Sequence, residues 1–144
     1  MLRKFKNERG ATLVEFAIGS TVFVMALFAV LEFGRALWVH NSLNDAARRG
    51  ARYAVLHSIN SNSSVANVVV YGDAAGGTQP IVPDLTTGNV EVTYSPDFVV
   101  NQGTATVKIT SYQFKFVLPF LPKTITMPAY STTLTAESAG FIPD

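Results

Sequence analysis

A single carboxylate lies inside the most apolar stretch of this 144-residue chain. Residues 16–31 carry no charge, and Glu15 directly precedes them. Because a helix rises ~1.5 Å per residue, residues 11–31 would span the ~30 Å hydrocarbon core of a bilayer, with Glu15 inside the apolar segment. A carboxylate facing lipid is costly, so we expect Glu15 to have a partner. The alternative is an acid near the interface that extends its carboxylate to water.

The residues before this stretch are mostly basic. Arg3, Lys4, Lys6 and Arg9 stand against a single acid, Glu8. Segments rich in Lys and Arg stay on the cytoplasmic side of a membrane. A helix at residues 11–31 would therefore keep its N-terminus in the cytoplasm and place the rest of the chain outside.

Two neighbouring segments carry a family resemblance. The run from Gly10 to Phe16, GATLVEF, resembles a type IV prepilin processing site. The continuation, EFGRA from Glu32 and AARRGARYAV from Ala46, is similar to the TadE-like pseudopilins of tight-adherence (Tad, Flp) pilus systems. It is the more specific match, because it lies outside the membrane segment that all pilins share. Major Flp pilins typically have Tyr after the Glu and a much shorter chain, so Phe16 and the long C-terminal region are typical of pseudopilins.

The resemblance implies a pseudopilin or minor pilin that acts in assembly or initiation of a type IVb pilus of the Tad (Flp) system. A prepilin peptidase would cut after Gly10, which makes Ala11 the first residue of the mature chain. Glu15, followed by Phe16, would then serve subunit assembly, with its carboxylate neutralising the terminal amine of an adjacent subunit. The implied partners are the prepilin peptidase, other pilins, the inner-membrane assembly platform and lipid. The implied location is the bacterial inner membrane, with a periplasmic C-terminal domain and incorporation into the fibre as one outcome.

Two other interpretations of the N-terminus stay open. A cleaved secretory signal would have a long apolar region, and its nearest small-x-small site, residues 34–36, contains Arg35. An uncleaved signal anchor is the stronger alternative. It would hold a periplasmic binding or adhesin module that never joins a fibre, and residues 1–10 would persist in the protein.

The helical pattern continues beyond the apolar run. No proline occurs between Glu32 and Val55, and small or apolar residues recur at helical spacing: Ala36, Leu43, Ala47, Gly50 and Ala54. We predict one helix from about residue 12 to about residue 56, which at ~1.5 Å per residue is ~65 Å long. Gly50 costs a helix up to ~1 kcal/mol relative to Ala, so we expect another element to pack closely against it.

Three residues mark the outer boundary of the predicted span. Glu32 and Arg35 can pair on one helix face, and we expect this pair to be exposed and to contribute little to stability. The ring of Trp38 suits the headgroup region.

The remainder alternates loop and strand patterns. A polar loop at residues 58–64 precedes residues 65–71, which fit a helix remnant or a short strand; Val68, Val69 and Val70 favour the strand. A long surface loop is predicted at 72–88. Further strands are predicted at 90–94, at 104–116 with a bulge or bend near Ser111, and at 124–137 with Pro128 at the start or edge; residues 118–122 should interrupt pairing. Antiparallel strands laid across the helix give an α+β, type IV pilin-like fold. The expected parts are a leader (1–10), a transmembrane helix (11–32), the extracytoplasmic half of that helix (33–57) and an outer β-rich domain (58–144).

Catalysis is not supported by the residue types present. The chain has no cysteine, and we expect its two histidines, His40 and His57, to be solvated or interfacial rather than metal ligands. The loop acids Asp73, Asp84 and Asp97 are expected to be solvated. We therefore predict no enzyme, cofactor, metal or small-molecule substrate, and no nucleic acid, because the outer region lacks a basic stripe. The cluster Arg48, Arg49 and Arg52 suggests a solvated helix face or a contact with acidic surfaces of neighbouring subunits or headgroups.

Overall fold

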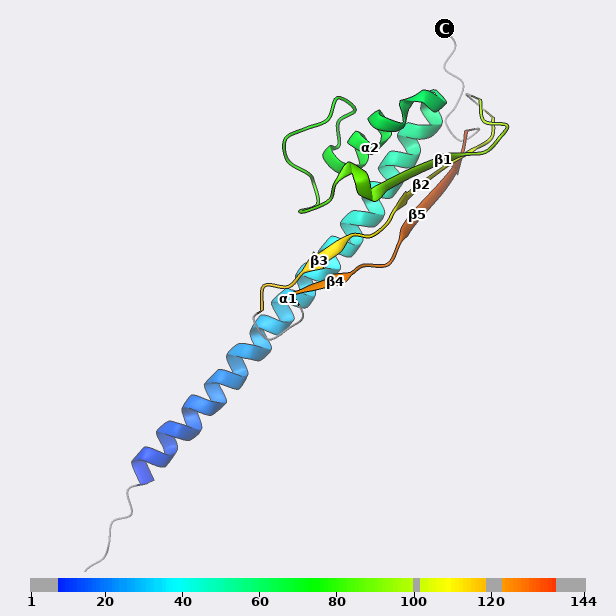
Figure 1. Cartoon of the computed structure of the whole chain (residues 1–144). Helices are drawn as coiled ribbons and strands as arrows, with labels where there is room; N and C mark the ends of the chain where they lie inside the picture. Colours follow the sequence, from blue (N-terminus) through cyan, green and yellow to red (C-terminus); the bar gives the residue numbers. More distant parts are fainter. Residues whose placement is uncertain (1–7, 100–101, 119–122, 137–144) are drawn as a thin grey trace, which may run out of the picture.

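One helix runs through most of the molecule's length (Figure 1). The structure, a computed structural model, describes residues 8–99, 102–118 and 123–136. Helix α1 spans Glu8–Leu56 and has 49 residues. It ends where the sequence predicted but begins four residues before Thr12. The residues from Glu8 to Thr12 contain no proline, so helical hydrogen bonding can continue through them.

A second helix replaces the strand predicted at residues 65–71, and that prediction was wrong. After a 3₁₀ turn, η1 (Ile59–Ser61), helix α2 spans Asn62–Tyr71. Its run of valines favours a strand locally. The buried Val65 and Val69, however, lie four residues apart, so one helical face enters the core. Gly72 ends the helix in the left-handed conformation (φ 79°), which glycine adopts at little cost.

The main sheet has three antiparallel strands. Strand β1 (Val90–Tyr94) follows a 3₁₀ turn, η2 (Thr87–Asn89), and pairs with β2 (Thr104–Ile109), which pairs with β5 (Tyr130–Thr135). Val92, Val107 and Thr132 form one row across the sheet. Ala105, Val107 and Ile109 are buried, as their alternation predicted.

A smaller hairpin continues from β2. The bend predicted near Ser111 is confirmed, since this residue has a positive φ of 56°. The single strand predicted at 104–116 was wrong, because the chain resumes as a separate strand, β3 (Gln113–Lys115), in a second sheet. Strand β3 pairs antiparallel with β4 (Thr124–Thr126). The single strand predicted from 124 to 137 was wrong, because residues 127–129, which include Pro128, separate β4 from β5. The interruption predicted at 118–122 and the end at Glu137 fall largely outside the described residues.

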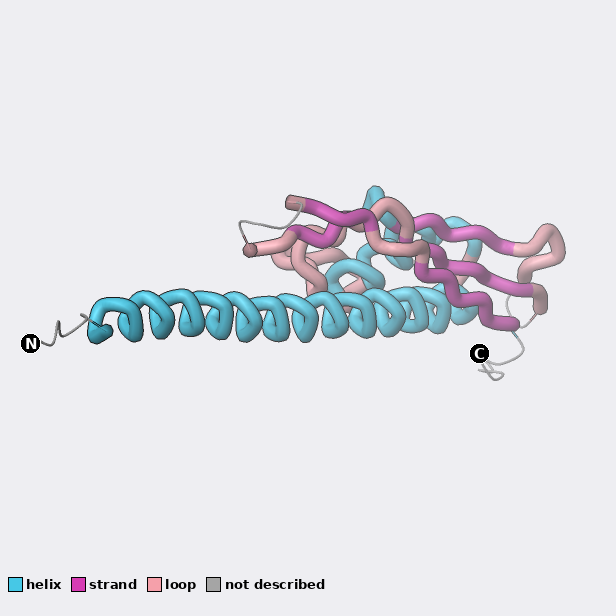
Figure 2. Tube along the Cα trace, turned by 90° about the horizontal axis from the view of Figure 1, so that it is seen from below, coloured by secondary structure: helices cyan, strands magenta, loops and turns pink. Residues whose placement is uncertain are grey.

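The helices cover the inner face of the three-stranded sheet (Figure 2). Helix α1 contacts α2, β2 and β5. A Cβ added to Gly50 would lie 2.3 Å from Val69 Cγ2 on α2 and 3.3 Å from Val107 Cγ1 on β2. The predicted close approach at Gly50 is therefore confirmed, and it involves both a helix and a strand.

The segment between α2 and β1 is more than the surface loop that the sequence predicted. Val82 and Leu85 are fully buried in the core. The Ile81 N–H donates to the carbonyl of Val70 (2.8 Å), and the hydroxyl of Tyr112 donates to the carbonyl of Pro83 (2.8 Å). A long apolar helix with a small antiparallel sheet on its C-terminal half makes this an α+β, pilin-like fold.

Candidate functional site: the bare helix and its junction with the outer region

The N-terminal half of α1 has no described element packed against it. Its side chains from Ala11 to Leu31 are exposed, except for the partly exposed Ser20. By length and composition this helix can cross a membrane, with a mean hydropathy of 2.2 in its most apolar window. Water is a poor solvent for such a surface. This half of the helix therefore needs lipid or other protein around it.

Glu15 lies on this bare segment. It is exposed, and its carboxylate forms no ion pair among the described residues. Phe16 beside it is 73 % exposed. The sequence predicted that the Glu15 carboxylate has a partner, and within the described part of the chain it has none.

Gly10 and Ala11 lie in the first turns of α1, and both are exposed. A Cβ added to Gly10 would meet nothing within 4 Å, and the same is true of Gly19 and Gly34. Packing therefore gives no reason for a glycine at position 10, in contrast to Gly50.

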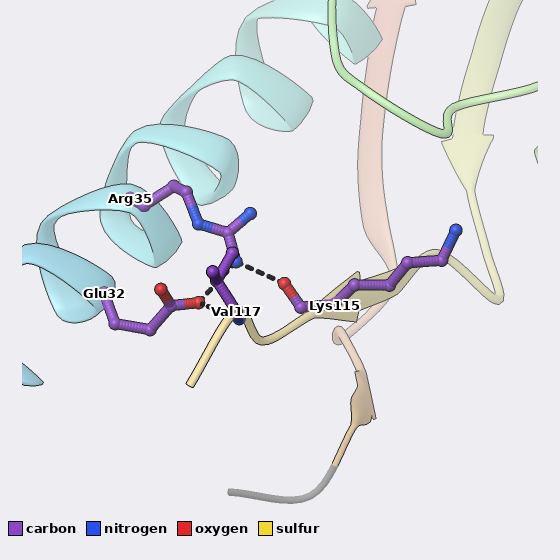
Figure 3. Close-up of polar contacts among 4 residues, drawn as sticks. All are labelled: Glu32, Arg35, Lys115 and Val117. Carbon is purple, nitrogen blue, oxygen red and sulfur yellow. Dashed lines mark hydrogen bonds and ion pairs between the residues drawn. The ribbon is translucent and has the colours of Figure 1, made fainter. Parts of the chain in front are cut away.

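We call residues 11–31 the bare helix and the chain from Glu32 onward the outer region. The junction between them is built around Glu32 (Figure 3). Among the described residues it is the one charged residue that is buried, at 8 % exposure. Its Oε1 accepts hydrogen bonds from the Arg35 guanidinium and from the backbone N–H of Val117, the latter at 3.2 Å. The expectation of an exposed pair of little consequence was wrong for Glu32, because the chain after β3 covers it.

Arg35 ties the same strand end to the helix. The guanidinium that pairs with Glu32 also donates to the carbonyl of Lys115. Its carbon lies 4.2 Å from the centre of the Phe114 ring, a cation–π distance, and Phe114 is fully buried. One carboxylate and one guanidinium therefore satisfy an N–H and a carbonyl at the end of β3. We call Glu32, Arg35 and the backbone of Lys115 and Val117 the junction.

The sequence contained a signal for this buried carboxylate. Counting back from the stripe of Ala36, Leu43, Ala47 and Gly50, position 32 continues the three-to-four spacing on the same face. An acid on the domain-facing side of a helix would be expected to meet polar backbone groups. Trp38, the third boundary residue, is exposed on α1.

One of the three clustered arginines, Arg49, stabilises a neighbouring helix. The Arg49 side chain donates to the carbonyls of Val68 (3.2 Å) and Val69 (3.4 Å). It therefore caps the C-terminal turn of α2, where a cation is favourable. Arg49 is thus not part of a solvated face, whereas Arg48 and Arg52 are exposed.

The two histidines contact aromatic neighbours. His40 Nδ1 lies 2.9 Å from the Tyr130 hydroxyl, and the His57 ring stacks on Tyr53 with centroids 3.8 Å apart. Within the described ranges, no group of three or more His, Cys, Asp or Glu side chains is placed to hold a metal ion.

Comparison with known families finds a match to this part of the chain. Residues 10–52 match the family described as TadE-like protein. This segment of the chain is similar to the TadE-like family. The matched segment begins at Gly10 and includes the bare helix, the helical half of the junction and the buried stripe up to Ala51. No curated protein and no solved structure matches the chain. The matched family links this segment to Tad pilus systems, and the long apolar helix indicates a membrane-anchored protein.

Proposed function

We propose that this protein is a TadE-like pseudopilin, or minor pilin, that acts in assembly or initiation of a Tad-type pilus. The observation that carries the proposal is the bare apolar half of α1, with one exposed carboxylate on it. A helix of this kind is stable in lipid and can also pack against equivalent helices of other subunits. The same surface therefore serves first as an anchor and then as an assembly face.

Maturation by prepilin peptidase after Gly10 belongs to this proposal. Cleavage would create a new amine on Ala11, four residues before Glu15. In a low-dielectric seam between helices, an unpaired charge resists burial, whereas a well-placed pair of opposite charges offsets much of that cost. Pairing of Glu15 with the amine of a neighbouring subunit would therefore set the register between subunits as well as attract them.

The proposed orientation follows from the basic residues before the helix. Arg3, Lys4 and Lys6 would hold the N-terminus in the cytoplasm, so that the outer region lies in the periplasm. Glu32, Arg35 and Trp38 would lie where the span leaves the bilayer. Other pilins and the inner-membrane assembly platform are the proposed partners.

The decisive experiment is the intact mass of the protein purified from its native membrane. A chain that begins at Ala11 is expected. A chain that still begins at Met1, in cells with active peptidase, would contradict the proposal and favour an uncleaved anchor carrying a periplasmic binding or adhesin module.

Variants at two glycines test the cleavage position. Gly10→Val is expected to retain residues 1–10, because a side chain next to the scissile bond would obstruct the peptidase. Gly19→Val is the matched control, since it lies on the same helix and its added side chain also meets nothing within 4 Å. Normal processing of Gly10→Val would exclude this position as the site.

A further inference from the structure

The end of the β3–β4 hairpin at which the chain connects the two strands lies where the apolar run of α1 ends. The Phe116 N–H donates to the carbonyl of Lys123 (3.0 Å), so the two strands approach each other one pair beyond Lys115 and Thr124. The Val117 N–H, 3.2 Å from Glu32 Oε1, then fixes this end beside the helix. Figure 1 shows the hairpin at the end of the outer region that is nearest to the bare helix.

This end of the hairpin exposes apolar side chains. Val117 is 77 % exposed and Ile125 is 50 % exposed. Lys123, between them in sequence, is also exposed. We call Val117, Lys123 and Ile125 the hairpin patch. On the adjacent helix, Leu31 and Phe33 flank Glu32 and are exposed as well.

Apolar exposure is not a general property of the strands. The outer face of the three-stranded sheet presents polar rows, such as Thr93, Thr106 and Thr133, and Glu91 with Lys108 and Ser131. Two large aliphatic side chains on the short hairpin therefore differ from their surroundings. Val117, two residues beyond β3, is also hydrogen-bonded to Glu32 at the end of the segment that needs lipid.

We infer that the hairpin patch docks onto the surface of the lipid bilayer that α1 crosses. Apolar side chains beside a lysine suit the interface, where the former enter the acyl boundary and the latter meets anionic headgroups. Val117 is hydrogen-bonded to Glu32, which Leu31 and Phe33 flank in the chain, so the patch lies at the end of the apolar helix and one lipid surface can cover both. With two attachment points, the helix and the hairpin, the outer region would have a fixed rotation and tilt relative to the membrane.

The inference rests on the proposed membrane span but not on cleavage or pilus assembly. Because the chain has no cysteine, a single introduced cysteine gives a unique spin-labelling site. Three variants of the full chain in liposomes with anionic lipid separate the possibilities: Val117→Cys in the patch, Phe23→Cys in the span, and Val99→Cys as the control. Val99 is another exposed valine, and its β1–β2 connection lies at the opposite end of the outer region (Figure 1).

The measurement is the ratio of two collision rates of the spin label. One is its rate with oxygen, which concentrates in lipid, and the other is its rate with a water-soluble nickel complex. The ratio at residue 117 is expected to rise on reconstitution and to fall between the high value at residue 23 and the aqueous value at residue 99. Replacing the anionic lipid with neutral lipid is expected to reduce the ratio at residue 117 alone.

Aqueous values at both 117 and 99, with a lipid value at 23, would overturn the inference and leave the span intact. An aqueous value at 23 would refute the span itself, and the inference with it. Protection at 117 that disappears on dilution of the protein in lipid would indicate contact with a second copy, which also overturns docking onto lipid.

Discussion

At the scale of single residues, Glu15 and Glu32 are two carboxylates on one helix with opposite surroundings. Glu15 is exposed on a segment that no described element covers, whereas Glu32 is buried and accepts hydrogen bonds from Arg35 and Val117. A buried, satisfied carboxylate holds a fold together within one chain. Under the proposed function, the exposed carboxylate of Glu15 would act when a second subunit packs against the helix.

Replacement of Glu15 separates these two roles. Glu15→Ala is expected to insert normally, because the change makes the span more apolar, but to co-purify with partner pilins several-fold less well and to reduce the number of pili. Glu91→Ala is the control, since Glu91 is an exposed carboxylate on the sheet. Unchanged pilus number and normal co-purification of Glu15→Ala would refute an assembly role.

Gly50 is expected to be intolerant of even one added carbon. The Cβ of Gly50→Ala would overlap Val69, which is fully buried, and overpacking of a core costs about 1–3 kcal/mol. Alanine regains about 1 kcal/mol of helix propensity, so we expect a net loss of up to about 2 kcal/mol in the free energy of unfolding. Denaturant unfolding in detergent, followed by the near-UV circular dichroism of the tyrosines, measures it. Gly34→Ala, with free space around the new Cβ, should be at least as stable as the parent.

At the scale of elements, the junction fastens the β3–β4 hairpin to α1. Glu32→Ala leaves the Val117 N–H without its acceptor and the Arg35 guanidinium without its carboxylate, a loss of about 1–3 kcal/mol for the hairpin. Hydrogen exchange should therefore become about tenfold faster or more at the Val117 amide. Amides of the three-stranded sheet should be unaffected.

Glu32→Gln is the matched variant for the same experiment. Its side-chain oxygen can still accept the Val117 N–H, but it no longer carries the charge that faces Arg35. Exchange at Val117 should then be intermediate between the parent and Glu32→Ala. Equal exchange in all three proteins would show that the hairpin is held by Phe114 and its apolar contacts alone.

The elements also show what the sequence could predict. The long helix, the alternation in β1 and β2, and the close approach at Gly50 follow from local spacing and were predicted. Helix α2 could not be derived from its valines, because its burial against Gly50 and its cap from Arg49 come from residues about twenty positions away. The stripe places Glu32 on the domain-facing side of α1, but the backbone group that covers it, the Val117 N–H, lies 85 positions later. Contacts of this range carry no local pattern.

At the scale of the whole molecule, the outer region has its own core. Every buried apolar residue in the described ranges lies at Val39 or beyond, and Glu32 is the first buried residue of the helix. The bare helix therefore contributes an exposed surface but no packing. The packed core of the described chain is therefore confined to its outer region.

This separation predicts that residues 32–144 fold without the anchor. The fragment keeps the junction and the core, and it begins with an acid at a helix N-terminus, which is favourable. It should be monomeric in size-exclusion chromatography without detergent and should melt cooperatively at a temperature close to that of the outer region in the full chain. The matched fragment 40–144 lacks Glu32, Arg35 and the buried Val39, so it should melt at a lower temperature. If 32–144 aggregated or melted no higher than 40–144, the bare helix or the lipid around it would be needed to hold the outer region together.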